Sequence, residues 1–178
     1  MKTKLNLIAI VFSMLFFSAC DKAEELTTFY VNDTFVIEAP VVIPEDPEGN
    51  PQNFIYSSEI DIRENADIDS NFGNIQHLAI NDFYLSISDY LANENIFAED
   101  VVVTVGSVII SLGDIDLSAF SATDERIQIG ETQQLNEIAS QLLNSSTITV
   151  SIEGTVSDTP VTFTATAVMD IRVTVNAI

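Results

Sequence analysis

The chain has very little of the side chains on which most catalytic and metal sites depend. Its 178 residues include one cysteine, one histidine and no tryptophan. A disulfide framework is therefore excluded, and a zinc site, which needs a cluster of Cys or His ligands, is not indicated. Nucleophilic catalysis needs a Ser, Thr or Cys beside a base. The single His77 falls in a strand-like segment, where a surface or half-buried position is a better interpretation than a catalytic base.

Basic residues are equally scarce. The chain holds six Lys and Arg against 27 Asp and Glu, which gives a formal net charge of −21. A surface of this sign repels nucleic acid, and neither a basic patch nor a glycine-rich phosphate loop counters it. Binding of nucleic acid is therefore excluded, and solubility is the simplest role for the charge, because Asp and Glu serve it best.

The longest apolar run lies at the N-terminus. Lys2 and Lys4 precede residues 5–17, a run that only Asn6 and Ser13 interrupt. A helix needs about 20 apolar residues to span a bilayer, and acidic residues follow this run almost at once. A signal peptide is therefore a better interpretation than a transmembrane helix.

The apolar run ends in a short motif, Phe17-Ser18-Ala19-Cys20, with small residues directly before the only cysteine. The motif resembles the lipobox of bacterial lipoproteins, although that family prefers leucine at the position of Phe17. The resemblance implies cleavage before Cys20 and attachment of a diacylglycerol and usually an N-acyl chain, such as palmitate, to this residue. Two or more acyl chains anchor a protein stably, whereas one binds reversibly. The alternative is an ordinary secretory signal whose first mature residue happens to be cysteine.

The residues that follow the cysteine suggest where in the cell the protein is located. The cluster Asp21-Lys22-Ala23-Glu24-Glu25 is similar to the export signals of Bacteroidota outer-membrane lipoproteins. That similarity implies the cell envelope, the outer membrane and a partner among outer-membrane proteins, in either the periplasmic or the surface-exposed leaflet. In enterobacteria an aspartate after the cysteine would instead imply retention in the inner membrane. A solvated acidic tether without a receptor is the third interpretation.

These features divide the chain into three parts. We expect a signal peptide over residues 1–19, an acidic tether over residues 20–28 and one domain over residues 29–178. Cleavage would leave four basic residues against 27 acidic ones, a net charge of −23. A domain of about 150 residues buries roughly two thirds of its unfolded surface. The apolar content of 47%, rich in Val and Ile, favours a packed core over disorder.

Alternation of apolar and polar residues predicts strands over most of the domain. The predicted strands cover residues 27–37, 54–63, 75–87, 101–112, 126–129, 147–156 and 161–176. The strand 101–112 is apolar on both phases and should be the most buried. The last two strands predict a long antiparallel hairpin. A phase slip predicts a bulge near Asn81-Asp82.

One helix is predicted, over residues 132–144, because apolar residues there recur at helical spacing behind the N-cap candidate Thr132. Seven strands and one helix predict an all-β fold, an antiparallel β-sandwich that is immunoglobulin-like in the loose sense. The tryptophan and cysteine pair of antibody domains is absent.

Three segments between the strands predict other structure. Residues 39–53 hold four of the five prolines and predict an exposed loop, either a plain crossover or a binding loop. Residues 64–74 predict a turn or short helix. Residues 113–125 predict a loop that turns Leu117 and Phe120 inward.

The segment 64–74 also places side-chain oxygen atoms at every second residue. They belong to Asn65, Asp67, Asp69 and Asn71. Hard-cation loops have this spacing, so the pattern indicates a calcium site. The EF-hand pattern then fails at its glycine and at its closing glutamate, and solvated turn acids are the alternative.

The sequence therefore predicts a lipid-anchored extracytoplasmic protein that binds or supports something without catalysis. One alternative is a carbohydrate-processing enzyme that uses paired carboxylates. Such sites are usually lined by aromatic rings, and this chain has no Trp and only four Tyr. The other alternative is a carrier of an apolar ligand, which would need a cavity between the sheets.

Overall fold

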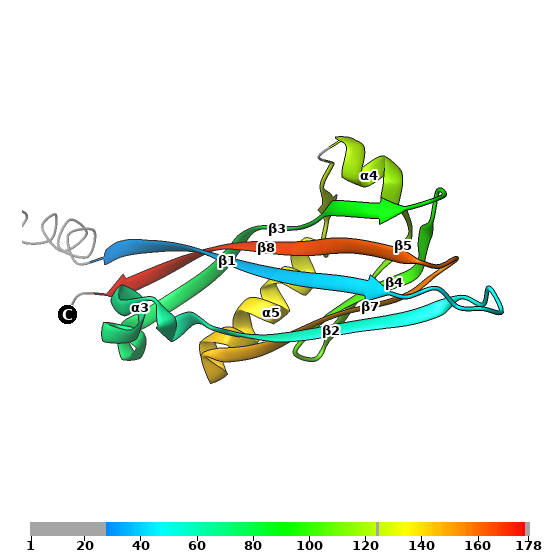
Figure 1. The fold of residues 1–178 in the computed structure, drawn as a ribbon. Coiled ribbons are helices and arrows are strands. Elements are labelled where there is room, and N and C mark those ends of the chain that lie inside the picture. The colour runs from blue at the N-terminus through cyan, green and yellow to red at the C-terminus, as the bar shows by residue number, and fades with distance from the viewer. Residues whose placement is uncertain (1–27, 124, 177–178) are drawn as a thin grey trace, which may run out of the picture.

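A computed structural model describes residues 28–123 and 125–176, in which eight strands form two antiparallel sheets of four strands each (Figure 1). The strands are β1 (Thr28–Ile43), β2 (Gln52–Asp61), β3 (Ile75–Ala92), β4 (Phe97–Val105), β5 (Val108–Asp116), β6 (Ile127–Gln128), β7 (Thr147–Val156) and β8 (Val161–Asn176). One sheet has the order β1-β8-β3-β6 and the other the order β2-β7-β4-β5. We name them the β8 sheet and the β7 sheet.

The strand pairs are nested within one another. β4 pairs with β5, β3 with β6, β2 with β7 and β1 with β8. Two four-stranded sheets joined in this order form a jelly roll. The predicted antiparallel β-sandwich is thus confirmed, and its likeness to immunoglobulin domains lies only in the packing of two antiparallel sheets.

The core lies between the sheets and is best seen on β8. Its eight odd-numbered side chains, from Val161 to Val175, are each at most 1% exposed. Phe163 meets Phe54 of the opposite sheet edge to face, with ring centroids 5.6 Å apart. The predicted phase of this strand is therefore confirmed. So is the predicted bulge in β3, because its register with β8 shifts between Ile80 and Asp82.

The predicted hairpin of the last two strands is wrong. β7 pairs with β2 and β4, whereas β8 pairs with β1 and β3, so the connection 157–160 crosses from one sheet to the other. Alternation reveals that each strand has one buried face. It does not reveal the neighbour, because in a sandwich both sheets turn their apolar faces to the same core.

The predicted single strand over residues 101–112 is also wrong, since it is a hairpin. β4 and β5 pair across the turn Gly106-Ser107, where Gly106 has a φ of +57° and donates its N–H to the Thr149 carbonyl at 2.8 Å. Before the turn the odd-numbered residues are buried, and after it the even-numbered Val108 and Ile110. The buried positions thus change from odd to even across the two turn residues. For this reason the sequence 101–112 has apolar residues at both odd and even positions.

The proline-rich loop is shorter than predicted, because β1 continues through Pro40 to Ile43. β1 is an edge strand, so a missing N–H on its free side costs no ladder bond. The N–H of Thr34, an even-numbered residue like Pro40, bonds instead to Asp33 Oδ1 at 2.9 Å. The even-numbered amides of β1 therefore face away from β8.

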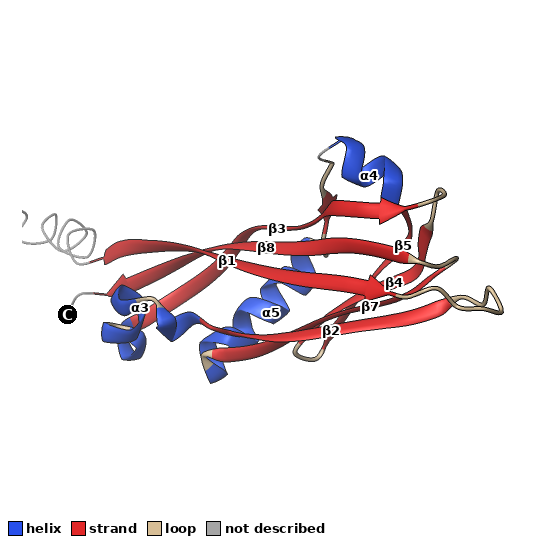
Figure 2. Cartoon of the chain, in the orientation of Figure 1, coloured by secondary structure: helices blue, strands red, loops and turns tan. Residues whose placement is uncertain are grey.

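The described helices are short and strands predominate (Figure 2). They are α3 (Ala66–Ser70), α4 (Leu117–Thr123) and α5 (Thr132–Ser145), and 3-10 turns cover Ile62–Glu64 and Phe72–Asn74. Within the described ranges, no helix is long and apolar enough to cross a membrane.

The helices confirm some predictions and correct others. The short helix predicted as one option for residues 64–74 is confirmed, as is the helix near 132–144, but its N-cap is Glu131 and not Thr132. The Glu131 N–H donates to Gln134 Oε1 at 2.9 Å. In a capping box, the N-cap residue donates its N–H to the side chain three residues later, so this bond identifies Glu131 as the N-cap.

The segment predicted as a loop over residues 113–125 is instead the end of β5 followed by α4. Its inward residues are confirmed, since Leu117 is fully buried and Phe120 packs against the core. Both α4 and α5 pack against β3 and β5, so they close the side of the sandwich between these two strands.

Candidate functional site

The two ends of the sandwich differ. Thr28 and Asn176, the first and last described residues, are paired in register at one end, which we call the terminal end (Figure 1). The connections 44–51, 93–96 and 157–160 join strands at the opposite end, which we call the loop end. The jelly-roll order brings these three connections together, because β1, β3 and β8 are neighbours in one sheet.

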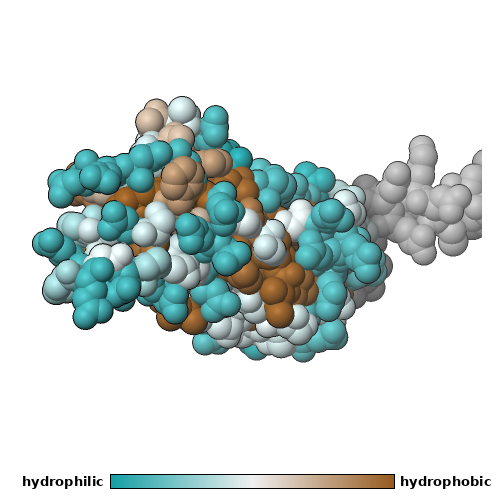
Figure 3. All heavy atoms as spheres, turned by 90° about the vertical axis from the view of Figure 1, so that its right-hand side faces the viewer, coloured by the Kyte–Doolittle hydropathy of each residue, from teal (hydrophilic) through white to brown (hydrophobic). Residues whose placement is uncertain are grey.

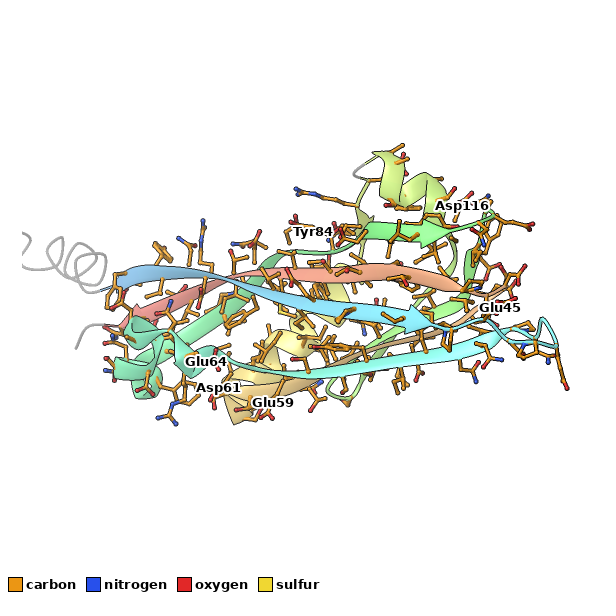
Figure 4. All side chains as sticks on the ribbon, viewed as in Figure 1. Glu45, Glu59, Asp61, Glu64, Tyr84 and Asp116 are labelled. Atoms are coloured by element: carbon orange, nitrogen blue, oxygen red, sulfur yellow. The ribbon has the colours of Figure 1, made fainter. Side chains whose placement is uncertain are left out.

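The three connections surround a depression of about 200 Å³ at the loop end. Its lining consists of Glu45, Asn93, Glu94, Ile96, Asp158, Thr159 and Pro160. Figure 4 shows Glu45 at this end of the molecule and Glu64 at the other. Figure 3 views the loop end and shows mainly hydrophilic side chains with hydrophobic areas between them. The depression is thus lined chiefly by polar groups, three of which are carboxylates.

Asp46 orders the first connection. Its carboxylate accepts hydrogen bonds from the Glu48 N–H at 3.1 Å, the Asn50 N–H at 3.0 Å and Gln52 Nε2 at 3.1 Å. These donors, the Glu48 amide foremost, hold the pKa of Asp46 below its ordinary value. The Asp46 N–H donates in turn to Thr159 Oγ1 at 2.8 Å. The proline-rich connection is therefore fixed to the connection between β7 and β8.

Tyr90 orders the second connection from β3. Its hydroxyl donates to the Glu94 carbonyl at 2.5 Å and accepts from the Ile96 N–H at 3.1 Å. Next to it, Asn95 Nδ2 donates to Asp116 Oδ2 at 3.2 Å. The Ala119 N–H bonds to the same carboxylate and is the larger cause of the lowered pKa of Asp116.

The chemistry of the depression is that of an anionic binding surface. Glu45, Glu94 and Asp158 offer oxygen acceptors, and the lining includes no aromatic ring and no Ser or Cys beside a base. Throughout the part of the chain that the structure describes, no three His, Cys, Asp or Glu side chains lie close enough to hold a metal ion. The arrangement can accept hydrogen bonds from an ammonium or guanidinium group.

Sequence reasoning found only one part of this site. The segment 39–53 was a candidate binding loop, whereas nothing in the sequence linked it to residues 93–96 or 157–160. The three acidic side chains lie far apart in the chain, and only the strand order joins them.

A titration of Asp46 tests whether its contacts order the loop. Because its pKa is lowered, its charge and the hydrogen bonds that need it persist until the pH falls through that lowered value. We expect the amide proton resonances of Glu48 and Asn50 in NMR spectra to move together on acidification, with a midpoint below that of an ordinary aspartate. In Asp46→Asn this transition should be absent, and a midpoint at or above the ordinary value would contradict the contacts.

The four residues predicted to bind calcium lie at the terminal end, around α3, and not in the depression. Asn65 Oδ1 accepts from the N–H groups of Asp67 and Ile68, at 3.0 and 3.3 Å, and so caps the helix. Asp69 pairs with Arg63 at 2.6 Å, and Asn71 Nδ2 donates to the Asp67 carbonyl at 2.8 Å. Residues two apart on a helix do not share a face, so the structure does not gather these side chains around one point.

Calcium binding stays a prediction that melting temperatures can test. A chain of this charge should be stabilised equally by Ca²⁺ and Mg²⁺ through general screening. A specific site would favour Ca²⁺, because Mg²⁺ demands a stricter octahedron. We expect equal shifts in differential scanning calorimetry. A rise specific to Ca²⁺ that disappears in the double variant Asp67→Asn, Asp69→Asn would contradict this expectation.

The remaining sequence candidates have different outcomes. His77 is exposed on β3 and pairs in register with Thr174, which confirms the surface-strand interpretation. Cys20, the signal peptide 1–19 and the tether up to residue 27 lie outside the described residues, so lipidation stays a prediction.

Comparisons with known proteins give no family. No protein-family model matches the chain, and no curated protein matches it. The solved structures that resemble it include three with TM-scores of 0.40 or below. One is Desmodium yellow mottle tymovirus, with 11% identity, a TM-score of 0.40 and coverage of 85% of this chain and 90% of that chain. Another is the decameric BFDV capsid protein, with 6% identity, a TM-score of 0.38 and coverage of 82% and 98%.

The third is infectious bursal disease virus strain Gx, with 12% identity and a TM-score of 0.31. The match covers 84% of this chain and 32% of that one. Similarities this distant say nothing about what the chain binds or does.

Proposed function

We propose that the protein is a lipid-anchored cell-envelope protein that binds a partner at its loop end and does not catalyse a reaction. The observation that carries this proposal is that the terminal end and the depression lie at opposite ends of the sandwich. Thr28 lies at the terminal end, opposite the depression, and is only eight residues after Cys20. Eight extended residues span at most about 29 Å. An anchor on Cys20 would therefore keep the terminal end near the bilayer and direct the loop end away from it.

The distribution of charge agrees with this orientation. None of the three loop-end connections contains a Lys or Arg, while they hold Glu45, Asp46, Glu48, Glu94 and Asp158. Anionic lipid headgroups repel such a surface, which is compatible with its outward position. A partner for the loop end should accordingly present ammonium or guanidinium groups, as a basic segment of an outer-membrane protein would.

The depression supports binding over catalysis. Carboxylates alone can hydrolyse a glycosidic bond, but the lining lacks the aromatic platform that such sites use to hold a sugar ring. The packed interior favours a binding protein over a carrier of an apolar ligand, which would need a cavity between the sheets. The largest side chains that meet between the sheets, including Phe83, Phe163 and Met169, are at most 1% exposed.

Substitution of the lipobox cysteine tests the anchor. In the wild type we expect mass spectrometry to find a mature N-terminus at Cys20 that carries acyl chains, and fractionation to place the protein in the outer membrane. Cys20→Ser should accumulate as an uncleaved or soluble form, because the modification needs the thiol. An unmodified thiol at Cys20 in the wild type would refute lipidation.

Two single-cysteine variants test the orientation. Acylation consumes Cys20, so Glu48→Cys at the loop end or Ser70→Cys at the terminal end would provide the only free thiol for a fluorescent label. In proteoliposomes with quencher-labelled headgroups, we expect stronger quenching at residue 70 than at residue 48. Equal quenching at both would refute the outward orientation while leaving lipidation intact.

A further inference from the structure

The outer face of the β8 sheet is left uncovered in the described part of the chain. The helices α4 and α5 pack against β3 and the β7 sheet, and neither has extensive contact with β1 or β8. Between residues 162 and 174 every even-numbered side chain of β8 points outward. We call these side chains, with the outward ones of β1 and β3 beside them, the outer β8 face.

The central strand of this face carries little charge for so acidic a chain, while the flanking strands add Glu38 beside Thr166 and Asp82 beside Asp170. Of the outward side chains of β8 only Asp170 and Arg172 are charged, and four of the other five are threonine. Large apolar side chains lie exposed along the flanking strands. They are Tyr30 at 64%, Val36 at 56%, Val42 at 72% and Leu91 at 71%. Val42 and Leu91 stand on either side of Thr162 in one row across the sheet.

Arg172 and Asp170 both make contacts within this face. Arg172 Nε donates to Asn32 Oδ1 at 3.2 Å, and its guanidinium carbon lies 5.7 Å from the centre of the Tyr30 ring. Asp170 Oδ1 accepts from Thr34 Oγ1 at 2.6 Å. Depletion of charge together with Tyr and Arg is typical of the centre of a protein interface.

The size of the face matches a stable interface. β1 and β8 are 16 residues long and fully paired, so they extend about 50 Å at about 3.3 Å per residue. Three strands spaced by about 4.8 Å make the face roughly 14 Å wide, or about 700 Å² for one copy. Two such faces would bury about 1,400 Å² in total, which is within the range of specific protein contacts.

We propose that the outer β8 face is the contact between two copies of this chain in a symmetric dimer. A second copy offers the same flat, weakly charged surface, and two twisted sheets pack face to face with their strands nearly aligned. Asp170 and Arg172 lie two residues apart on β8, so the face of each copy offers a positive group to the acidic groups of the other. Most other surfaces of the chain are acidic and would repel a second copy.

Attachment of both copies to one membrane would set the direction of the symmetry axis. If the axis runs along the strands, both terminal ends lie on the same side and both lipid anchors can enter one membrane. Confinement to that membrane would raise the effective concentration of the copies. The contact does not involve the loop end, so it goes beyond the proposed function and leaves the depression free on both copies.

Crosslinking in intact cells tests the contact on the protein as it exists. Thr166 lies near the middle of the outer β8 face, and Ser151 is its counterpart on the central strand of the other sheet, between Ser57 and Thr104. Thr166→Cys should form disulfide-linked dimers under mild oxidation, and Ser151→Cys should not. Equal crosslinking of the two variants, or none in Thr166→Cys, would overturn the proposal.

Sedimentation equilibrium of the mature protein in density-matched detergent tests the affinity. We expect the dissociation constant of the dimer to fall several-fold as NaCl rises from about 50 to about 300 mM, because salt screens the repulsion between acidic copies. Thr166→Asp should weaken the dimer by at least about thirtyfold, because like charges would meet across the contact. Ser151→Asp should leave the dissociation constant unchanged. A wild type that stays monomeric, or a dimer that Thr166→Asp leaves intact, would overturn the proposal.

Discussion

Met169→Asp is expected to lower the free energy of unfolding by about 4 kcal/mol or more, because it places a charge without a partner in the core. Met169 is 1% exposed on the inner face of β8, and its register neighbours are Phe35 of β1 and Phe83 of β3. Neither neighbour offers a hydrogen-bond donor to a carboxylate. Urea unfolding followed by circular dichroism measures the change.

Thr166→Asp is the matched control for this prediction. Thr166 belongs to the opposite, outward phase of the same strand, where a carboxylate stays in water. We expect a change in unfolding free energy within about 0.5 kcal/mol when the chain is monomeric. If both variants lost the same stability, the phase of β8 would be wrong.

Gly106→Ala is expected to have the second largest effect, about 2 to 3 kcal/mol, from two causes that add. The left-handed backbone at a φ of +57° costs a residue with a Cβ about 1 to 2 kcal/mol. The added carbon would also lie 2.9 Å from Ile148 Cδ1 and against Gln141 Oε1. Gln141 cannot move freely, because Oε1 accepts from the Ser107 N–H at 3.1 Å and Nε2 donates to Ser107 Oγ at 2.9 Å.

Gly49→Ala separates the two causes. Gly49 has a similar φ of +66°, but a Cβ there would meet no atom within 4 Å. We expect it to lose only the backbone cost, about 1 to 2 kcal/mol, in the same unfolding measurement. Equal losses of unfolding free energy in the two variants would mean that Gln141 and Ile148 can move away from the added carbon without loss of stability.

The sequence predicts best what depends on local periodicity. The alternation from residue 161 to 175 identified every buried side chain of β8, and the phase slip identified the bulge at Asn81. The apolar stripe of α5 was equally visible. These signals are local, because the spacing of apolar residues within a single strand or helix shows which of its faces is buried.

Pairing between strands could not be predicted in the same way. β7 and β8 read as a hairpin because they are adjacent in sequence, yet β7 pairs with β2 and β4 and β8 pairs with β1 and β3. The loop end shows the same limit, since Glu45, Glu94 and Asp158 meet only through that pairing. The N-cap at Glu131 was missed because a Thr beside it has the higher general preference for that position.

The nesting of strand pairs determines when the chain can finish folding. The innermost pair, β4 and β5, closes through a two-residue turn, whereas the outermost joins Thr28 to Asn176, 148 positions apart. Pairings between distant segments form slowly, because loop closure must precede the contacts that repay it. Synthesis also runs from the N-terminus, so β1 is made first and must wait for β8, the last of these strands to be made. The nested order thus keeps the sandwich open until β8 has been synthesised.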